Sequence, residues 1–166
     1  MKHAFRTITA AALVSAAFSA HAAATCDTNA MTDARTCHSA YVMPPGGGVY
    51  TLIQLDGTAV LFATVPDVGQ DRWHITRVLI RVDGAAPLVL TPGAAQSDPD
   101  CSGHRCHWDG TALVRLTSAQ WQTVTAGTTV LLSVGDVGGA VSEPIQLDPG
   151  KLRTALADMA AEGLTP

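Results

Sequence analysis

The chain has 166 residues, of which 47% are hydrophobic and 14% charged, and its formal net charge is −4 at pH 7. This length and apolar content suffice for one domain with a hydrophobic core of its own. An acidic chain lacks the basic surface that binds nucleic acid or anionic lipid, so the expected partners include neither.

Residues 1–22 have the three parts of a secretory signal peptide. Lys2 and Arg6 provide a positive start, residues 8–19 form a short apolar run, and Ala-His-Ala at 20–22 is a small-residue cleavage site. The apolar run is too short to cross a bilayer as a helix, and no later run is long enough. The sequence therefore predicts a protein that is exported, to the periplasm or to the medium, with no membrane span.

Four cysteines in an exported chain predict two disulfides, because thiols in an oxidising compartment tend to pair. The local pairing, one of three connectivities, joins Cys26 to Cys37 and Cys101 to Cys106. Each bridge would then close a short loop without regular structure, and would stabilise the fold by roughly 2–3 kcal/mol. A redox role is the alternative, but neither pair has the C-x-x-C spacing of a redox motif.

The first half of the expected domain, which spans residues 23–166, is rich in segments of strand length. Residues 25–45 are polar, and the Pro-Pro-Gly-Gly-Gly run at 44–48 interrupts regular structure. Asp56-Gly57 is typical of a tight hairpin turn, because both residues tolerate positive φ. The expected strands are Val49–Leu55, Thr58–Val65, Ile75–Val82 and Pro87–Leu90.

The second half combines further strands with two helices. Residues 91–109 are expected to form a loop. Thr117 and Gln120 have the spacing of a capping box, which predicts a short helix to about Thr125. Asp148 and Pro149 predict the start of a C-terminal helix. Its apolar stripe consists of Leu152, Ala155, Leu156 and Met159. The expected strands here are Thr111–Leu116, Thr128–Val134 and Ala140–Gln146.

Many short strands, frequent turns and few helices predict a mostly β protein. The expected fold is an antiparallel β-sandwich with a short internal helix and a C-terminal helix. The clearest alternation is in residues 75–82, where Val78 and Ile80 would face the core while Arg77 and Arg81 would face outwards.

The segment Cys101-Ser-Gly-His-Arg-Cys-His107 allows two further interpretations. It resembles a widely spaced version of the C-x-x-C-H haem attachment motif, with His107 as axial ligand and Met43 or another histidine opposite. Alternatively, histidine and aspartate side chains of this loop and of other segments could bind a metal ion. The candidate ligands are His38, His74, His104, His107 and Asp109. Oxidised sulfurs cannot serve as ligands, so the disulfide interpretation predicts neither a metal nor a cofactor.

Signals of enzymatic chemistry are absent from the sequence. It has no G-x-S-x-G elbow, no H-E-x-x-H motif and no phosphate-binding loop. Asp98 and Asp100 are paired carboxylates, but they lie in a Ser-Asp-Pro-Asp turn, where aspartate is favoured for its bonds to the backbone. The sequence therefore predicts no catalytic residues.

The order of these features resembles the invasion-associated locus B family of exported proteobacterial proteins. The resemblance rests on three segments: Val65-Pro66-Asp67-Val68-Gly69, then Val-Leu-Ile-Arg-Val-Asp-Gly at 78–84, and the close cysteine pair at 101 and 106. The aromatic residue that the family has before its terminal helix is missing from residues 147–152, and so is the early tryptophan. The resemblance implies a divergent member, a small envelope-associated β-rich protein without established catalysis.

The leading functional hypothesis is a non-enzymatic exported protein that binds a protein partner. The expected contact surface is the loop from Pro99 to Asp109, with His104, Arg105, His107 and Trp108 as contacting side chains. A short disulfide would lower the cost of ordering such a loop. Two alternatives remain open: a metal- or haem-binding protein using the same loop, and an inhibitor or immunity protein of a secreted enzyme.

Overall fold

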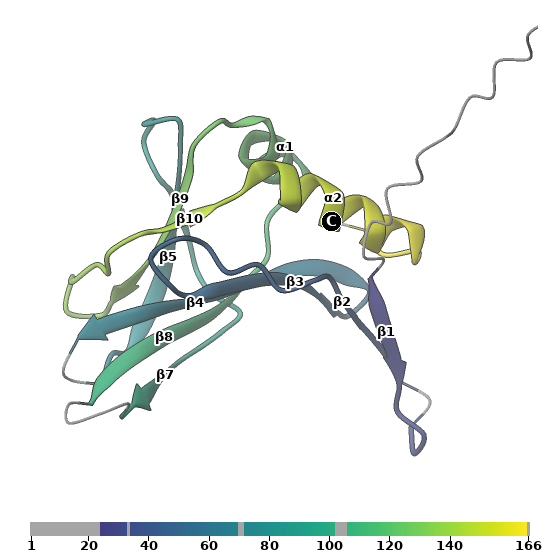
Figure 1. The fold of residues 1–166 in the computed structure, drawn as a ribbon, viewed down its shortest axis with the longest axis horizontal. Helices are drawn as coiled ribbons and strands as arrows, with labels where there is room; N and C mark the ends of the chain where they lie inside the picture. Colours follow the sequence, from purple (N-terminus) through teal and green to yellow (C-terminus); the bar gives the residue numbers. More distant parts are fainter. Residues whose placement is uncertain (1–23, 33, 70–71, 102–105, 166) are drawn as a thin grey trace, which may run out of the picture.

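The computed structural model describes residues 24–32, 34–69, 72–101 and 106–165, and it shows a mostly antiparallel β protein with two helices (Figure 1). The predicted signal peptide lies outside these residues. Sheet A has the strand order β1 (Thr25–Thr28), β2 (Arg35–His38), β3 (Val49–Leu55), β4 (Thr58–Gly69), β8 (His107–Val114) and β7 (Ala94–Asp100). Sheet B has the order β10 (Ile145–Leu147), β9 (Val130–Asp136), β5 (Ile75–Val82) and β6 (Leu88–Leu90). The predicted class, a β-sandwich with an internal helix and a C-terminal helix, is confirmed.

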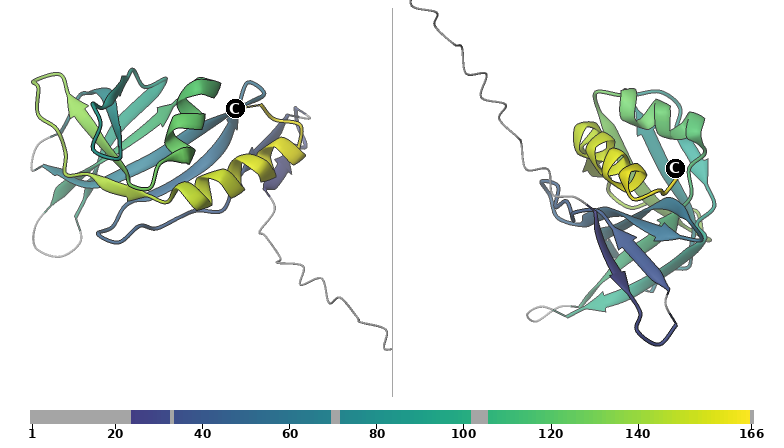
Figure 2. Two further views of the ribbon diagram at one scale, coloured as in Figure 1. Left: turned by 90° about the horizontal axis from the view of Figure 1, so that it is seen from above. Right: turned by 90° about the vertical axis from the view of Figure 1, so that its right-hand side faces the viewer.

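Sheet B and both helices, α1 (Ser118–Ala126) and α2 (Pro149–Ala161), pack on the same face of sheet A (Figure 2). One continuous cluster of buried side chains shows this arrangement. Its members include Leu52, Ala63 and Val114 from sheet A, Val78 and Leu132 from sheet B, and Trp121 and Leu152 from the helices. Neither described helix is long and apolar enough to span a membrane.

The alternation predicted in β5 positions sheet B. Val78 and Ile80 are fully buried in the core, and Arg81 is exposed. Arg77 faces outwards and lies across β9, where the absence of a side chain at Gly135 leaves room for it. A Cβ atom at Gly135 would lie 2.4 Å from Arg77 Nε. The Arg77 guanidinium also donates to the carbonyl of Gly139 at 3.0 Å, which ties the strand to the following turn.

The turn and cap signals in the sequence are confirmed. Asp56 and Gly57 both have positive φ, 51° and 76°, in the tight turn that joins β3 to β4. Thr117 accepts a hydrogen bond from the amide of Gln120, whose side chain accepts one from the amide of Thr117. Asp148 accepts from the first free amides of α2. These local bonds fix where both helices begin.

Three parts of the chain differ from the sequence-based expectation. The expected strand Ala140–Gln146 is reduced to β10, which begins at Ile145 directly after Pro144, a residue without a backbone donor. Residues 91–109 were expected to form a loop, but they contain β7 and the start of β8; residues 25–45 contain the β1–β2 hairpin. Both β1 and β7 are edge strands, and each has only one or two side chains that are not exposed. An edge strand is held by backbone bonds to one neighbour, so its sequence does not need an apolar pattern.

The Cys26–Cys37 disulfide also differs from expectation in its surroundings. The predicted pairing is present, but the two cysteines are directly opposite each other in the β1–β2 ladder, not at the ends of an irregular loop. Cys37 is fully buried. The bridge therefore holds an otherwise polar hairpin against the core at the outer edge of sheet A.

We expect Gly110→Ala to destabilise the protein by about 1–3 kcal/mol, because side chains of both sheets occupy the space beside Gly110. An added Cβ would lie 2.9 Å from Val68 Cγ1 and 3.0 Å from Val134 Cγ2. Gly93→Ala is the matched control: its Cβ would have no neighbour nearer than 4.0 Å, so stability should be unchanged or higher by up to about 1 kcal/mol. Urea unfolding of both variants checks this, and equal midpoints would contradict it.

Candidate functional site

The predicted contact loop lies at the end of the β7–β8 hairpin. The structure joins Cys101 to Cys106 by a disulfide directly after the last ladder pair, Asp100 opposite His107. The bridge thus fastens the ends of two paired strands, and the residues that it encloses lie outside the described ranges. His104 and Arg105, two of the predicted contacts, lie outside the described residues.

The two remaining predicted contacts, His107 and Trp108, point to opposite faces of sheet A. Successive side chains of a strand alternate between faces. Trp108 is half-buried and packs against the core, together with the buried Ala112 of the same strand. His107 therefore points to the other face of the sheet, which we call the outer face, and Trp108 does not share a contact surface with it.

Carboxylates surround His107 on the outer face. Its Nε2 atom lies 3.5 Å from Asp100 Oδ2 and 3.8 Å from Asp109 Oδ1. Asp98 is directly opposite Asp109 in the ladder, and Asp109 also accepts a hydrogen bond from the amide of Asp67. Like charges directly opposite each other in a sheet are destabilising. This end of the outer face is therefore an acidic region that a cationic surface would stabilise.

Next to the acidic region, the outer face is apolar. Val60 is 1% exposed yet is not part of the core cluster, which places it on this face. Ile53 is directly opposite Val60, and Phe62 is directly opposite Leu113. Ile53, Phe62 and Leu113 are half-buried. We call Ile53, Val60, Phe62 and Leu113 the apolar strip; within the described part of the chain, no helix and no second sheet covers it (Figure 1).

The threonine hydroxyls beside the apolar strip already have protein partners. Thr64 and Thr111 are hydrogen-bonded to each other at 3.1 Å across β4 and β8. Thr51 donates to the carbonyl of Ser39 at 2.8 Å and is 2% exposed. Covering this face would therefore leave few polar groups without a partner, and unsatisfied polar groups are the main cost of burying a surface.

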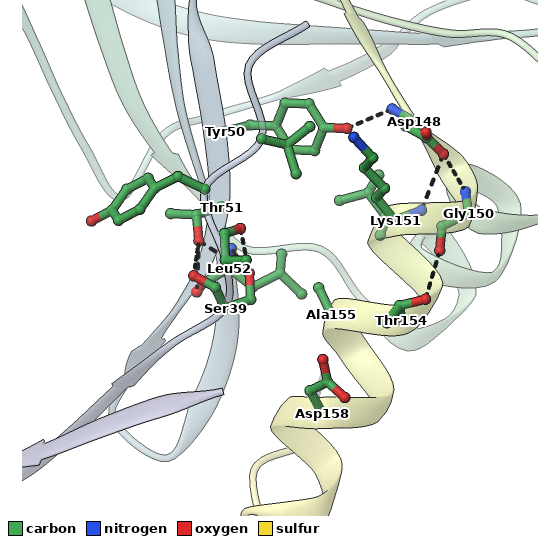
Figure 3. Close-up of a pocket in the computed structure, with 14 residues that line it drawn as sticks. Ser39, Tyr50, Thr51, Leu52, Asp148, Gly150, Lys151, Thr154, Ala155 and Asp158 are labelled. Carbon is green, nitrogen blue, oxygen red and sulfur yellow. Dashed lines mark hydrogen bonds between the residues drawn. The ribbon is translucent and has the colours of Figure 1, made fainter. Parts of the chain in front are cut away.

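A second candidate site is a groove of about 450 Å³ between α2 and the part of sheet A that is formed by β3 and the segment after β2 (Figure 3). Ser39–Val42, which continues β2, and β3 form one wall, and α2 forms the other. Two polar contacts tie α2 to the sheet. Near the start of the helix, the amide of Asp148 donates to the Tyr50 hydroxyl at 2.7 Å; at its end, Glu162 forms an ion pair with Arg35.

The groove has an apolar interior and charged groups on the helix side. Leu52 and Leu152 are buried in it, and the small side chain of Ala155 faces it from α2 (Figure 3). Lys151 and Asp158 line it one above the other on the same helix, and neither forms an ion pair with any residue that the structure describes. No pattern in the sequence predicted this site. The signal that could have indicated the groove was Ala155, the one small residue among the large side chains of the apolar stripe of α2.

The residues of the metal-binding alternative do not form a site in the described ranges. Outside the gap at 102–105, which contains His104, no three histidine, cysteine or carboxylate side chains are arranged to hold a metal ion. His38 packs against the ring of Tyr41, with the ring centroids 5.6 Å apart, whereas His107 lies in the acidic region. All four cysteine sulfurs are in disulfides, so none is a thiolate ligand.

No family model matches the chain, and no curated protein matches it in sequence. Among solved structures, the chain is similar to the crystal structure of invasion associated protein B from Bartonella henselae. The identity is 12% and the TM-score 0.47, over 84% of this chain and 90% of that one. Likeness at this level carries no argument about activity or partners, and membership of the family that the sequence resembles stays a prediction.

We expect Tyr50→Phe to lower the free energy of unfolding by about 1 kcal/mol at neutral pH, because the amide of Asp148 loses its acceptor. Burial raises the pKa of the Tyr50 hydroxyl above its ordinary value of 10.0; the amide hydrogen bond from Asp148 opposes this, and the charge of Asp148 adds to it. The stability that depends on protonated Tyr50 is present in full below pH 10 and is lost as the pH rises towards the raised value. Denaturant unfolding between pH 7 and 11 should show that the free energy of unfolding falls less with rising pH in the variant than in the unmodified protein.

Proposed function

We propose that the protein is exported, to the periplasm or to the medium, and binds a protein partner without catalysing a reaction. The binding surface consists of the apolar strip and the acidic region at the end of the β7–β8 hairpin. Of the contacts predicted from the sequence, His107 belongs to this surface; His104 and Arg105 are proposed to extend it. Trp108 is left out because it packs against the core.

The observation that supports this proposal best is the composition of the outer face. An apolar strip with satisfied hydroxyls beside it is suited to burial against another protein, and apolar centres with polar rims are typical of protein interfaces. The neighbouring carboxylates select the kind of partner. Asp98 and Asp109 repel each other in the free protein, so lysine or arginine side chains of a partner would relieve this repulsion and speed association.

The disulfide gives the acidic region a defined shape before the partner arrives. Because Cys101 and Cys106 fasten the ends of paired strands, the side chains of Asp100 and His107 keep their ladder positions. A surface that is ordered in the free state loses less conformational entropy on binding. The alternative of an inhibitor or immunity protein uses the same surface, with a secreted enzyme as the cationic partner.

A photo-crosslinking amino acid at position 62, in the apolar strip, should give one adduct of defined mass in the cells that produce the protein. The same amino acid at Ala160, which is exposed on α2, is the matched control and should give none. Mass spectrometry identifies the partner, and binding is then measured with both proteins purified. Equal adducts from both positions, or none from position 62, would refute the proposed surface.

The double variant D98N/D109N should weaken binding of the purified partner about tenfold, because it removes two carboxylates from the acidic region. The loss should shrink as the salt concentration rises, since salt screens charge attraction. D27N/E143Q removes the same net charge from exposed positions outside that region and should leave the affinity within about twofold. Equal losses in the two double variants would show that only net charge matters.

A further inference from the structure

No strand in the described ranges occupies the sheet position beside residues 39–43. β1 begins at Thr25, opposite His38, so no strand described in the structure pairs with the outer edge of the segment that follows β2. The inner edge of this segment is bonded to β3: the amide of Ser39 donates to Leu52, and Val42 exchanges both backbone bonds with Tyr50. The segment is therefore held as a strand with one free side.

The free side presents unused backbone groups. The amides of Ala40, Tyr41 and Met43 form no hydrogen bond with any residue in the described ranges. Tyr41 is 58% exposed and Met43 is 80% exposed, so water can reach this edge. Open strand edges of this kind are the sites at which extended peptides add to a sheet by backbone hydrogen bonds.

The open edge runs along the groove between β3 and α2 (Figure 3). A strand that added at residues 39–43 would place alternate side chains over the groove, where Val42 and Ala155 are half-buried and offer an apolar contact surface. The polar contacts of Tyr50 with Asp148 and of Arg35 with Glu162 hold α2 in place. The groove is thus preformed, which lowers the cost of binding.

Two charges on the helix indicate the sequence that the groove would accept. Lys151 and Asp158 are seven residues apart on α2, which corresponds to about 10 Å along the helix axis. An extended chain covers this length in about three residues. Side chains that share one face of a strand are two or four residues apart. A peptide with an acidic side chain near Lys151 and a basic one two or four residues away, near Asp158, would pair with both.

We propose that the groove binds an extended peptide segment of a partner protein, which adds as a strand to the open edge at residues 39–43. Because the backbone groups of Val42 face β3, those of Tyr41 and Met43 face the free side, and hydrogen bonds to them give general affinity for an extended chain. Apolar side chains that enter the groove, together with the charge pairs to Lys151 and Asp158, give sequence preference. This site is separate from the outer face of sheet A and does not depend on the function proposed for it.

The test begins with a phage library of random seven-residue peptides, selected on the immobilised full chain. Enriched peptides should carry acidic and basic residues two or four positions apart, so that both side chains face the groove. Synthetic versions are then measured by fluorescence anisotropy. Ala155→Trp, which fills the groove, should weaken binding at least about tenfold. Ala160→Trp, on the exposed side of the same helix, should leave it within about twofold.

Charge reversal tests the preference without changing the shape of the groove. The variant K151E/D158K should lose affinity for the selected peptides and regain it for peptides in which the acidic and basic positions are exchanged. Both charges lie on the helix surface, so circular dichroism and the melting temperature should show that the fold is retained. D98N/D109N should bind the peptides as the unmodified protein does, which separates this site from the outer face.

Amide hydrogen exchange, followed by NMR, decides whether the peptide adds as a strand. Bound peptide should slow exchange at Tyr41 and Met43, while the amide of Thr123 on α1 serves as an unaffected reference. The proposal is overturned if no peptide is enriched, if A155W and A160W bind alike, or if exchange at the edge does not change. A concentration-dependent dimer that A155W abolishes would also overturn it, because a second copy would then occupy the groove.

Discussion

The burial of one face of sheet A is the constraint on which the rest of the structure depends. Side chains such as Leu52, Ala63 and Val114 point to this face from three adjacent strands, and all are buried. Their cover comes from two sources, since sheet B packs over one part of the sheet and the two helices pack over another. Hydrophobic burial of this kind supplies most of the stability of a domain of this size. The groove beside α2 and the uncovered outer face both result from the limited extent of this cover.

The groove exists because a straight helix covers a twisted sheet incompletely. Sheets twist from strand to strand, whereas α2 contacts β3 and is tied to the sheet by Asp148 near its start and by Glu162 at its end. Between these contacts the helix presents Ala155, whose small side chain leaves the groove unfilled. β1 begins at Thr25, opposite His38, so no described strand pairs with the outer edge of the segment that follows β2. An apolar groove and free backbone donors therefore lie side by side.

The outer face illustrates the other consequence of one-sided cover. Its apolar strip is held together by contacts among its own side chains, and its hydroxyls bond to one another or to the backbone. The acidic region at the hairpin end carries paired carboxylates that the fold alone would not favour. A binding partner with basic side chains would relieve the repulsion between these carboxylates, which is why the proposed function uses this region. The disulfide between Cys101 and Cys106 keeps that region in register with the ladder.

Features that depend on local bonds and on apolar alternation could be predicted from the sequence. Asp56-Gly57, the capping box at Thr117 and the buried face of β5 act over a few residues, so their signals are complete in the sequence. Cysteine spacing likewise predicted both disulfides. Only the tertiary structure revealed β1 and β7, because edge strands are held by backbone bonds that any polar sequence can form. It alone separated His107 from Trp108, since a strand sends neighbouring side chains to opposite faces once its register is set. The groove joins Ser39 to Ala155 across more than a hundred residues, and no local pattern encodes that contact.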